Sequence, residues 1–260
     1  MRNIPPGLLA LGRSPLPESI RVGGDTYRFD TLFKHDFFAA TALYVGPAGK
    51  VVLKLGRQAG ILGLPAEWIG RLLARREAAA YDALADLDAV PGFLGRWGPT
   101  GIVHEFIEGD PLARDLAVPD DFFELLKGAI ETLHARGMAY VDLEKRQNVI
   151  LGSDGKPYLI DFQISWLLPA KYGGQTLPAR WLRDRLQEGD RYHLLKLHRR
   201  IRRDQLSDVE IAESYRKPRW VRIHRWLAAP YQKFRRPALK RLDPSRKIEE
   251  RGTISGARRS

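Results

Sequence analysis

Four polar residues of this chain stand at positions where their side chains could do chemistry. Lys54 lies inside an apolar run, and Asp161 directly follows two apolar residues. Asp142 and Asn148 lie six positions apart, upstream of Asp161. Carboxylate and amide oxygens are ligands that magnesium prefers, and a fixed lysine ammonium can neutralise phosphate groups. A strand-edge lysine and turn-capping aspartates would explain each residue singly, but they do not explain the ordered set.

Strands and helices must position these residues. Alternating apolar and polar residues predict strands at 19–22, 26–29, 41–45, 51–55 and 101–107. A spacing near 3.6 residues predicts helices at 65–87, at 119–133, and from Asp190, as N-terminal cap, to 201. Glu77 falls within the first helix, where an exposed position on the helix face is the simpler interpretation. The segments 148–151 and 158–160 predict a hairpin, and Glu108–Pro111 is typical of a turn.

This order of elements predicts an α+β fold with two lobes. We expect an irregular lead-in at 1–18, a small β-rich N-terminal lobe at 19–108, and a helical C-terminal lobe at 109–215. A basic tail follows at 216–260, where 15 Lys and Arg stand against 3 Asp and Glu. Residues 1–215 carry 28 charges of each sign, so the net charge of +12 belongs to the tail.

Composition excludes several classes of protein. The chain has no Cys, which excludes disulfides, cysteine-ligated zinc and a cysteine nucleophile, and is compatible with a reducing cytoplasm. No apolar run approaches the roughly 20 residues of a membrane-spanning helix. The first residues contain prolines and only a short apolar stretch, so we do not expect a secretory signal.

The polar residues, in this order and spacing, resemble the protein-kinase-like superfamily over about residues 20–205. The resemblance implies a two-lobed kinase-like fold that uses ATP and magnesium. Lys54 matches the strand lysine that contacts ATP phosphates, and Glu77 matches the helix acid that pairs with it. The segment Tyr140-Val-Asp142-Leu…Asn148 is similar to the catalytic loop. Asp161-Phe-Gln stands where Asp-Phe-Gly binds magnesium.

The resemblance also assigns roles within the cleft. Asp142 would orient an acceptor hydroxyl and take its proton. Lys145 would reach the transferring phosphate, although a solvated loop lysine is an equal alternative. Asn148 would be a magnesium ligand with Asp161, and Gln147 is its rival because the loop is one residue longer than usual. The hinge that holds adenine through its backbone would be Glu105, Phe106 and Ile107.

The chain departs from ordinary protein kinases at several places. No glycine-rich loop precedes Lys54; Ala39, Ala40 and Thr41 occupy that place and would let phosphate approach the backbone less closely than glycine. Tyr140-Val141 replaces His-Arg, which removes the arginine that receives an activation-loop phosphate. Gln163 replaces the glycine after the magnesium aspartate, and no Ala-Pro-Glu follows.

These departures resemble the compact atypical kinases, namely the RIO group of serine/threonine kinases and the bacterial lipopolysaccharide-core sugar kinases. The implied acceptor is a hydroxyl on an envelope saccharide (heptose or Kdo) or on protein Ser/Thr. The alternative is a pseudokinase, a scaffold that binds nucleotide and a membrane or partner without transferring phosphate.

The tail at 216–260 combines aromatic residues at three- and four-residue steps with arginines and lysines on other faces. A basic amphipathic segment of this kind is typical of membrane-surface elements, which would place a cytoplasmic protein at the inner face of the cytoplasmic membrane. Packing of the aromatic stripe on the body is the alternative. Nucleic acid is less favoured because no nucleic-acid motif accompanies the charge.

Overall fold

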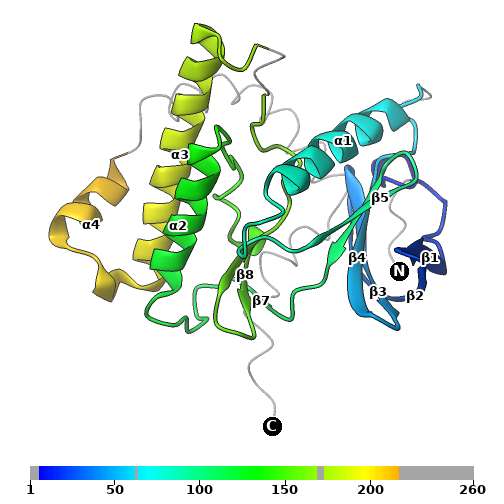
Figure 1. Cartoon of the computed structure of the whole chain (residues 1–260), viewed down its shortest axis with the longest axis horizontal. Helices are drawn as coiled ribbons and strands as arrows, with labels where there is room; N and C mark the ends of the chain where they lie inside the picture. Colours follow the sequence, from blue (N-terminus) through cyan, green and yellow to red (C-terminus); the bar gives the residue numbers. More distant parts are fainter. Residues whose placement is uncertain (1–5, 62–63, 169–172, 217–260) are drawn as a thin grey trace.

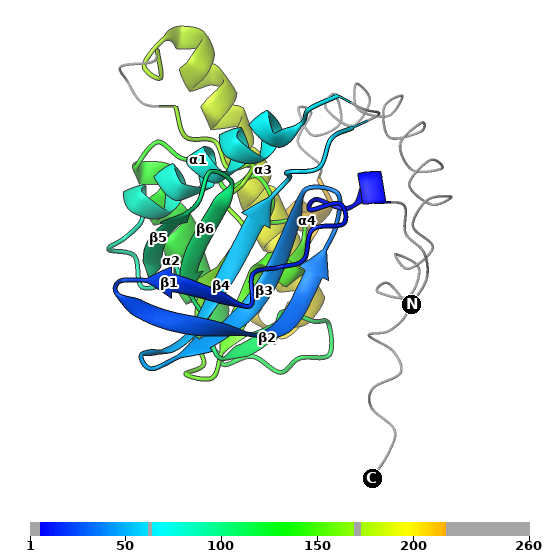
Figure 2. The ribbon, with the colours of Figure 1, turned by 90° about the vertical axis from the view of Figure 1, so that its right-hand side faces the viewer.

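A six-stranded antiparallel sheet is the framework of the N-terminal lobe. The computed structural model describes residues 6–61, 64–168 and 173–216. The strand order is β1-β2-β3-β4-β6-β5. The strands are β1 (Ser19–Val22), β2 (Asp25–His35), β3 (Ala39–Gly46), β4 (Gly49–Gly56), β5 (Phe93–Trp97) and β6 (Gly101–Glu105). Figure 2 shows this sheet with α1 beside it.

Helix α1 (Glu67–Ala83) packs against β4, β5 and β6. Its buried side is lined mainly by small residues, so the helix approaches the sheet closely. At Gly70 an added methyl carbon would lie 2.2 Å from the carbonyl oxygen of Arg57, so this position requires glycine. Glu77 belongs to the same buried side and is therefore held at the junction of helix and sheet.

The C-terminal lobe is formed by helices around a small sheet. Helices α2 (Phe122–Ala135) and α3 (Leu177–Ile201) lie side by side, and α4 (Asp208–Tyr215) packs on α3. The small sheet has the order β7-β8-β9, from β7 (Gly109–Pro111), β8 (Val149–Gly152) and β9 (Pro157–Leu159). In Figure 1, β7 and β8 lie between the helices on the left and the six-stranded sheet with α1 on the right. The predicted α+β architecture with two lobes is confirmed.

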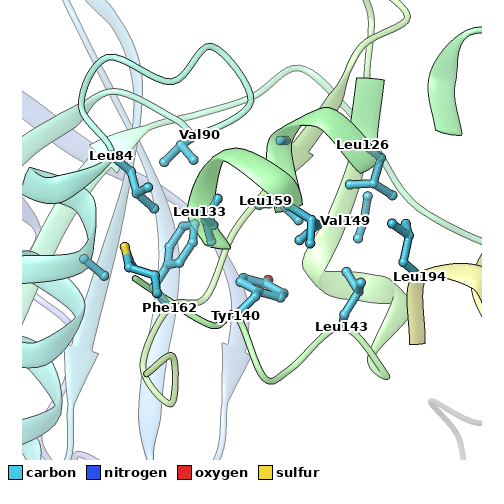
Figure 3. Close-up of a cluster of buried hydrophobic side chains, with 14 of the residues drawn as sticks. Leu84, Val90, Leu126, Leu133, Tyr140, Leu143, Val149, Leu159, Phe162 and Leu194 are labelled. Carbon is cyan, nitrogen blue, oxygen red and sulfur yellow. The ribbon is translucent and has the colours of Figure 1, made fainter. Parts of the chain in front are cut away.

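One apolar core joins the two lobes. It contains Tyr81 and Leu84 of α1 and continues through Phe162 and Tyr140 to Leu194 of α3. Figure 3 shows part of this core, with Leu84, Phe162, Tyr140 and Leu194 labelled. A second core lies within the sheet, and Leu11 of the lead-in packs into it. The lead-in is thus attached to the sheet, although its only regular element is the 3-10 helix η1 (Pro6–Leu8) within the described part of 1–18.

The structure corrects two sequence-based expectations for the fold and adds one strand. Glu108–Pro111 is not simply a turn, because Gly109–Pro111 pairs with β8 as β7. Strand β5 was not predicted; it is short and half-buried, and Gly95 at φ 118° interrupts its register. Asp190 does not cap a helix, because α3 already begins at Leu177, and the aspartate lies in its middle.

Other expectations are confirmed or stay open. The hairpin of β8 and β9 is confirmed. The lobe boundary predicted at residue 108 falls between β6 and β7, and the division of the chain at that residue stays a prediction. The tail lies outside the described residues from 217 onward. Within the described part of the chain, no helix combines the length and apolar character needed to cross a membrane.

Candidate active site

Lys54 is the centre of a charged cluster between the two lobes. It lies on β4, an inner strand of the sheet, and is buried. Its Nζ is 2.8 Å from Oε1 of Glu77 on α1 and 2.7 Å from Oδ1 of Asp161, which follows β9. Glu77 is 1% exposed, so it is not a residue of the outer helix face. Lys54, Glu77 and Asp161 come from three distant segments, and the fold brings them into direct contact.

The cluster holds one lysine for two carboxylates, and their pKa values separate accordingly. Burial opposes the charge of Asp161, but Lys54 outweighs it and lowers the pKa of Asp161 to about 2. For Glu77 burial is the larger effect, and it raises the pKa to about 7 despite Lys54. Burial disfavours the lysine charge, yet the two carboxylates together raise the pKa of Lys54. Asp161 is therefore the carboxylate that stays ionised.

The register of the sheet adds Lys34 to this face. Lys34 of β2 is opposite Thr41 of β3, and Thr41 is opposite Lys54 of β4. Side chains directly opposite each other in antiparallel strands lie on the same face, so the three form a row. Lys34 also acts on Asp161 as a nearby positive charge. This second lysine was not predicted, because the register shifts within β2 break the alternation that would have shown its face.

The β2–β3 turn is Asp36–Phe38, and we name it the nucleotide-side turn. The predicted phosphate-approach residues lie just after it on β3, where Ala39 and Ala40 are buried and paired with β4. Asp36 Oδ1 accepts from the N–H groups of Phe38 at 2.8 Å and Ala39 at 3.0 Å. The turn therefore lies just before the predicted residues Ala39, Ala40 and Thr41. It contains no glycine, and the Asp36 side chain stabilises it through these two hydrogen bonds.

Arg57 fixes the nucleotide-side turn from beneath. Its guanidinium donates to the carbonyl oxygens of Phe37 at 2.7 Å, Gly7 at 2.6 Å and Gly60 at 3.0 Å. It also stacks on the Phe37 ring, 4.0 Å from the centroid. Arg57 is 0% exposed. The lead-in helps here too, since the Ala10 N–H donates to the carbonyl oxygen of Asp36 at 2.8 Å.

Asp142 is the centre of the second half of the site. It is buried, and its Oδ2 accepts from Lys145 Nζ at 2.6 Å and from Asn148 Nδ2 at 3.0 Å. Burial is the main effect on its carboxyl and raises its pKa, against the influence of Lys145. Asn148 is buried beside Asp142 in the 3-10 helix η2 (Arg146–Asn148), whereas Gln147 is exposed. Of the two rivals, Asn148 is the one that lies beside Asp142.

Asp190 of α3 holds the backbone of the predicted catalytic loop, residues 140–148. Its two oxygens accept from the N–H groups of Tyr140 at 2.7 Å and Val141 at 2.8 Å, and from His134 Nε2 at 3.0 Å. Val141 has φ 71°, a conformation that a β-branched residue adopts only under constraint. Asp190 is 1% exposed. Gln187, one helical turn before Asp190, also supports this loop. Its amide donates to the carbonyl oxygens of His134 and Met138.

A column of aromatic rings connects the parts of the site. Phe162, next to Asp161, packs edge-on against Tyr81 of α1 at 5.1 Å and Tyr140 of the catalytic loop at 5.3 Å. Tyr81 in turn stacks on His104 of β6 at 5.4 Å. The hydroxyl of Tyr140 donates to the carbonyl oxygen of Ile160. Through these rings α1, β6 and both aspartate segments pack together; Figure 3 shows Tyr140 and Phe162 of the column.

The predicted hinge begins at Glu105, the last residue of β6. The Glu105 N–H donates to the carbonyl oxygen of Gly92 at 2.8 Å, and the Phe106 N–H donates to that of Lys50 at 3.2 Å. Among the described residues, Ile107 N–H has no hydrogen-bond acceptor. Of the three hinge amides, only that of Ile107 is thus available to a ligand.

The donor set near Asp161 and Asn148 suits magnesium. The ionised Asp161 carboxylate and the Asn148 amide oxygen are hard oxygen ligands. The amide oxygen of Asn148 is available because its Nδ2 is the atom that donates to Asp142. Asp142 and Asp161 interact electrostatically, so the two segments face one site. The described residues contain no group of three or more His, Cys, Asp or Glu arranged for a metal. A site with one carboxylate and one amide would depend on phosphate and water for its other ligands.

Three residues of the site lay outside the sequence predictions, namely Lys34, Arg57 and Asp190. The signal for Arg57 was its place three positions after Lys54 at the end of an apolar strand. Asp190 carried no local signal, because its partners are 49 to 56 residues away in the sequence.

The chain is similar to solved structures. No protein-family model matches the chain, and no curated protein matches it. The Rio2 kinase of Chaetomium thermophilum, in its ADP/Mg2+-phosphoaspartate complex, is similar at 18% identity and a TM-score of 0.49, over 75% of this chain and 61% of that one. A second Rio2 kinase structure from that organism has 17% identity and a TM-score of 0.48, over 75% and 62%. The chain thus spans about three fifths of the length of these two structures.

Proposed function

We propose that this protein is an ATP- and magnesium-dependent phosphotransferase that transfers the γ-phosphate to a hydroxyl group. The observation that carries the proposal is the Lys54–Glu77–Asp161 cluster, with 2.8 Å and 2.7 Å contacts, facing the buried Asp142. Phosphoryl transfer needs mainly alignment and charge neutralisation, and these residue types supply both.

The chain's own residues would bind and orient ATP. Lys54 would exchange its contact with Asp161 for the α- and β-phosphates while Glu77 keeps it in place. Lys34 and Thr41, in the same row, would contact the phosphates further out. Ile107 N–H would donate to adenine. Asp161 and Asn148 would hold magnesium, which neutralises phosphate charge when it is bound.

Asp142 would orient the acceptor hydroxyl and take its proton. Its pKa is raised by burial, which makes the carboxylate a stronger base than an exposed aspartate. Lys145 is 57% exposed at its side chain and 2.6 Å from Asp142, so it can turn from Asp142 to the transferring phosphate. The arginine that receives an activation-loop phosphate is replaced by Val141, so this site would need no phosphorylation of that kind to become competent.

The acceptor is a separate part of the proposal. An envelope saccharide of the lipopolysaccharide-core type and protein Ser/Thr are the two classes that the motifs favour. The Lys-His-Asp-Phe-Phe-Ala-Ala-Thr segment and the Asp-Phe-Gln form favour the saccharide. The basic tail would place the enzyme at the inner face of a membrane, close to a lipid-anchored acceptor.

ATP turnover by the purified full chain tests this function. We expect Asp142→Ala and Asp161→Ala each to lower the rate at least about 100-fold, because each removes a group that acts in the transition state. Asp82→Ala, at an exposed position of α1, is the matched control and should keep the wild-type rate. Equal rates in all four proteins would rule the proposal out.

A pseudokinase scaffold is the second candidate. The nucleotide-side turn favours it, because two phenylalanines and the fixed Asp36 stand where kinases use glycine. The residues of the site favour a working enzyme, because every charged group that phosphoryl transfer needs is present, namely Lys54, Glu77, Asp142 and Asp161. Magnesium-dependent ADP binding without phosphate transfer to saccharide or protein substrates would favour the scaffold.

A further inference from the structure

Two phenylalanine rings meet at the hinge side of the proposed nucleotide site. Phe33 of β2 and Phe106 of the predicted hinge are stacked, with ring centroids 6.0 Å apart and planes at 24°. Phe106 is also tied to Lys50, whose carbonyl oxygen accepts from its N–H and whose Nζ lies 5.6 Å from its ring centroid. Phe33 is 48% exposed. The pair therefore offers an aromatic surface next to Ile107, whose N–H has no acceptor among the described residues.

A bulge in β2 gives Phe33 its position. Leu32 is opposite Ala42 of β3, and the next pair along the strand is Lys34 and Thr41. Phe33 is therefore an extra residue with no partner of its own on β3. Bulges near binding sites commonly redirect a side chain. Here the bulge lets Phe33 reach the hinge ring, although β3 and β4 separate β2 from β6 in the sheet.

The carbonyl oxygen of Glu105, the first residue of the predicted hinge, already has a partner. His104 Nδ1 lies 2.7 Å from it, and because a carbonyl oxygen only accepts hydrogen bonds, Nδ1 carries the proton. Burial lowers the pKa of His104 to about 4, so the ring is neutral near pH 7. Stacking on Tyr81, at 5.4 Å between centroids, holds the ring in place. One of the two lone pairs of the Glu105 oxygen is thus occupied by the protein itself.

The hinge consequently presents a base with an unengaged donor, the Ile107 N–H, and an engaged acceptor, the Glu105 oxygen. Adenine carries an amino group at position 6, where guanine carries a carbonyl oxygen. The amino group would have to share the Glu105 oxygen with His104, whereas the carbonyl oxygen can accept from Ile107 alone. Stacking on aromatic rings does not separate the two bases, because every base has a π face.

We propose that the nucleotide base is held mainly by stacking on Phe33 and Phe106, and that the protein takes GTP as well as ATP as its phosphate donor. The inference rests on the proposed function and widens its donor to purine nucleoside triphosphates. Rejection of an analogue by factors of about 10⁴ requires that the analogue leave a polar group of the site unpaired. When guanine binds here, the Glu105 oxygen keeps His104 as its partner, so the penalty is small. His104 is thus a positioning residue for base selectivity.

Titration calorimetry of ADP and GDP, each with magnesium, on the full chain tests the stacking. We expect the two dissociation constants of the wild type to agree within about tenfold. Phe33→Leu should weaken both nucleotides about tenfold and leave their ratio unchanged, since stacking reads no base edge. Phe29→Leu is the matched control at another exposed position of β2, opposite Tyr44, and should bind both nucleotides as the wild type does.

His104→Phe tests the positioning role. The substitution keeps a ring beside Tyr81 and leaves the Glu105 oxygen to the adenine amino group alone. We expect the ratio of the GDP to the ADP dissociation constant to rise about tenfold over that of the wild type. Both constants are measured on one protein, so their ratio does not depend on the folded fraction. The ratio of kcat/KM for ATP to that for GTP should change in the same direction.

Several results would overturn the inference. These are GDP binding more than about 100-fold weaker than ADP binding in the wild type, equal effects of Phe29→Leu and Phe33→Leu, or an unchanged ratio in His104→Phe. Binding of ADP alone, with phosphate transfer from ATP, would overturn it and retain the phosphotransferase. Comparable binding of ADP and GDP through Phe33, without transfer to saccharide or protein, would retain the base site and count against the phosphotransferase. Binding of neither nucleotide would overturn both.

Discussion

The two loops that line the proposed cleft are each fixed by one buried charged residue, and the two residues work in opposite ways. Arg57 donates to three carbonyl oxygens around the nucleotide-side turn, including that of Phe37 at 2.7 Å. Asp190 accepts from the N–H groups of Tyr140 and Val141 in the catalytic loop at 2.7 Å and 2.8 Å. The nucleotide-side turn is thus fixed through backbone carbonyl acceptors, and the predicted catalytic loop through backbone N–H donors.

The difference indicates which loop depends more on its anchor. The nucleotide-side turn joins two paired strands, so the ladder between β2 and β3 keeps its shape even without Arg57. The catalytic loop has no such ladder at Tyr140 and Val141, and its φ of 71° at Val141 must be held from outside. An unpaired buried N–H is also rarer, and less easily tolerated, than an under-satisfied carbonyl. Asp190 should therefore be the more critical of the two.

Removing Asp190 should give the largest effect. We expect Asp190→Ala to lower kcat at least about 100-fold, because the loop that carries Asp142 loses its two backbone anchors. The free energy of unfolding should fall by about 3–5 kcal/mol, as a buried hydrogen-bonded charge is lost. Single-turnover phosphate transfer and thermal unfolding measure the two effects.

Asp190→Asn controls for folding, since it keeps the volume and one acceptor oxygen. It should unfold at a higher temperature than Asp190→Ala and still lose most of kcat, with ADP affinity within about threefold of the wild type. A folded Asp190→Asn protein with wild-type kcat would show that the catalytic loop needs no such anchor.

Loosening the nucleotide-side turn should have a smaller effect, confined to nucleotide binding. We expect Arg57→Met to raise KM for ATP about tenfold while kcat changes less than about threefold, because the ladder survives and only the turn becomes mobile. Arg75→Met, at an exposed position of α1, is the matched control. A fall in kcat as large as that in Asp190→Asn would remove the contrast between the two loops.

The same contrast explains what the sequence could predict. Lys54, Glu77, Asp142, Asn148 and Asp161 stand in order beside apolar runs, so their types and spacing were enough to propose the set. The anchors were not accessible in this way. The local sequence around Asp190 predicts only a helix cap, because the residues it contacts in the predicted catalytic loop are 49 and 50 positions away. Lys34 was missed because strand register decides its face.

The fold shows the same limit. Long periodic elements such as α1 and the β3–β4 hairpin were predicted close to their observed bounds, because their apolar residues repeat over several turns or pairs. The local sequence of the three-residue strand β7 predicts a turn, since only its pairing with β8 makes it a strand. The tertiary structure also places Asn148 beside Asp142 and exposes Gln147, a difference between the two residues that the sequence does not show.

The two halves of the site, around Asp142 and around Asp161, should also differ in their pH dependence. Burial raises the pKa of Asp142 above its usual value near 4, whereas Lys54 outweighs burial and lowers that of Asp161 to about 2. As the pH falls, Asp142, the proposed base, is therefore protonated before Asp161, the proposed magnesium ligand. We expect kcat to be lost at a higher pH than magnesium-dependent ADP affinity, with both measured across the acid range on the same protein.

Lys145→Met tests the cause of this separation. Lys145 opposes the effect of burial on Asp142, so its removal should raise the pKa of Asp142 and move the acid limb of kcat to higher pH. The acid limb of ADP affinity should move much less, because Asp161 is held ionised chiefly by Lys54. The maximal value of kcat will fall if Lys145 contacts the transferring phosphate. The pH at which kcat is half lost does not depend on that maximal value, so it still reports the pKa of Asp142. Limbs that move together would mean that one titration controls both halves, and that the catalytic loop is not electrostatically separate from the nucleotide side.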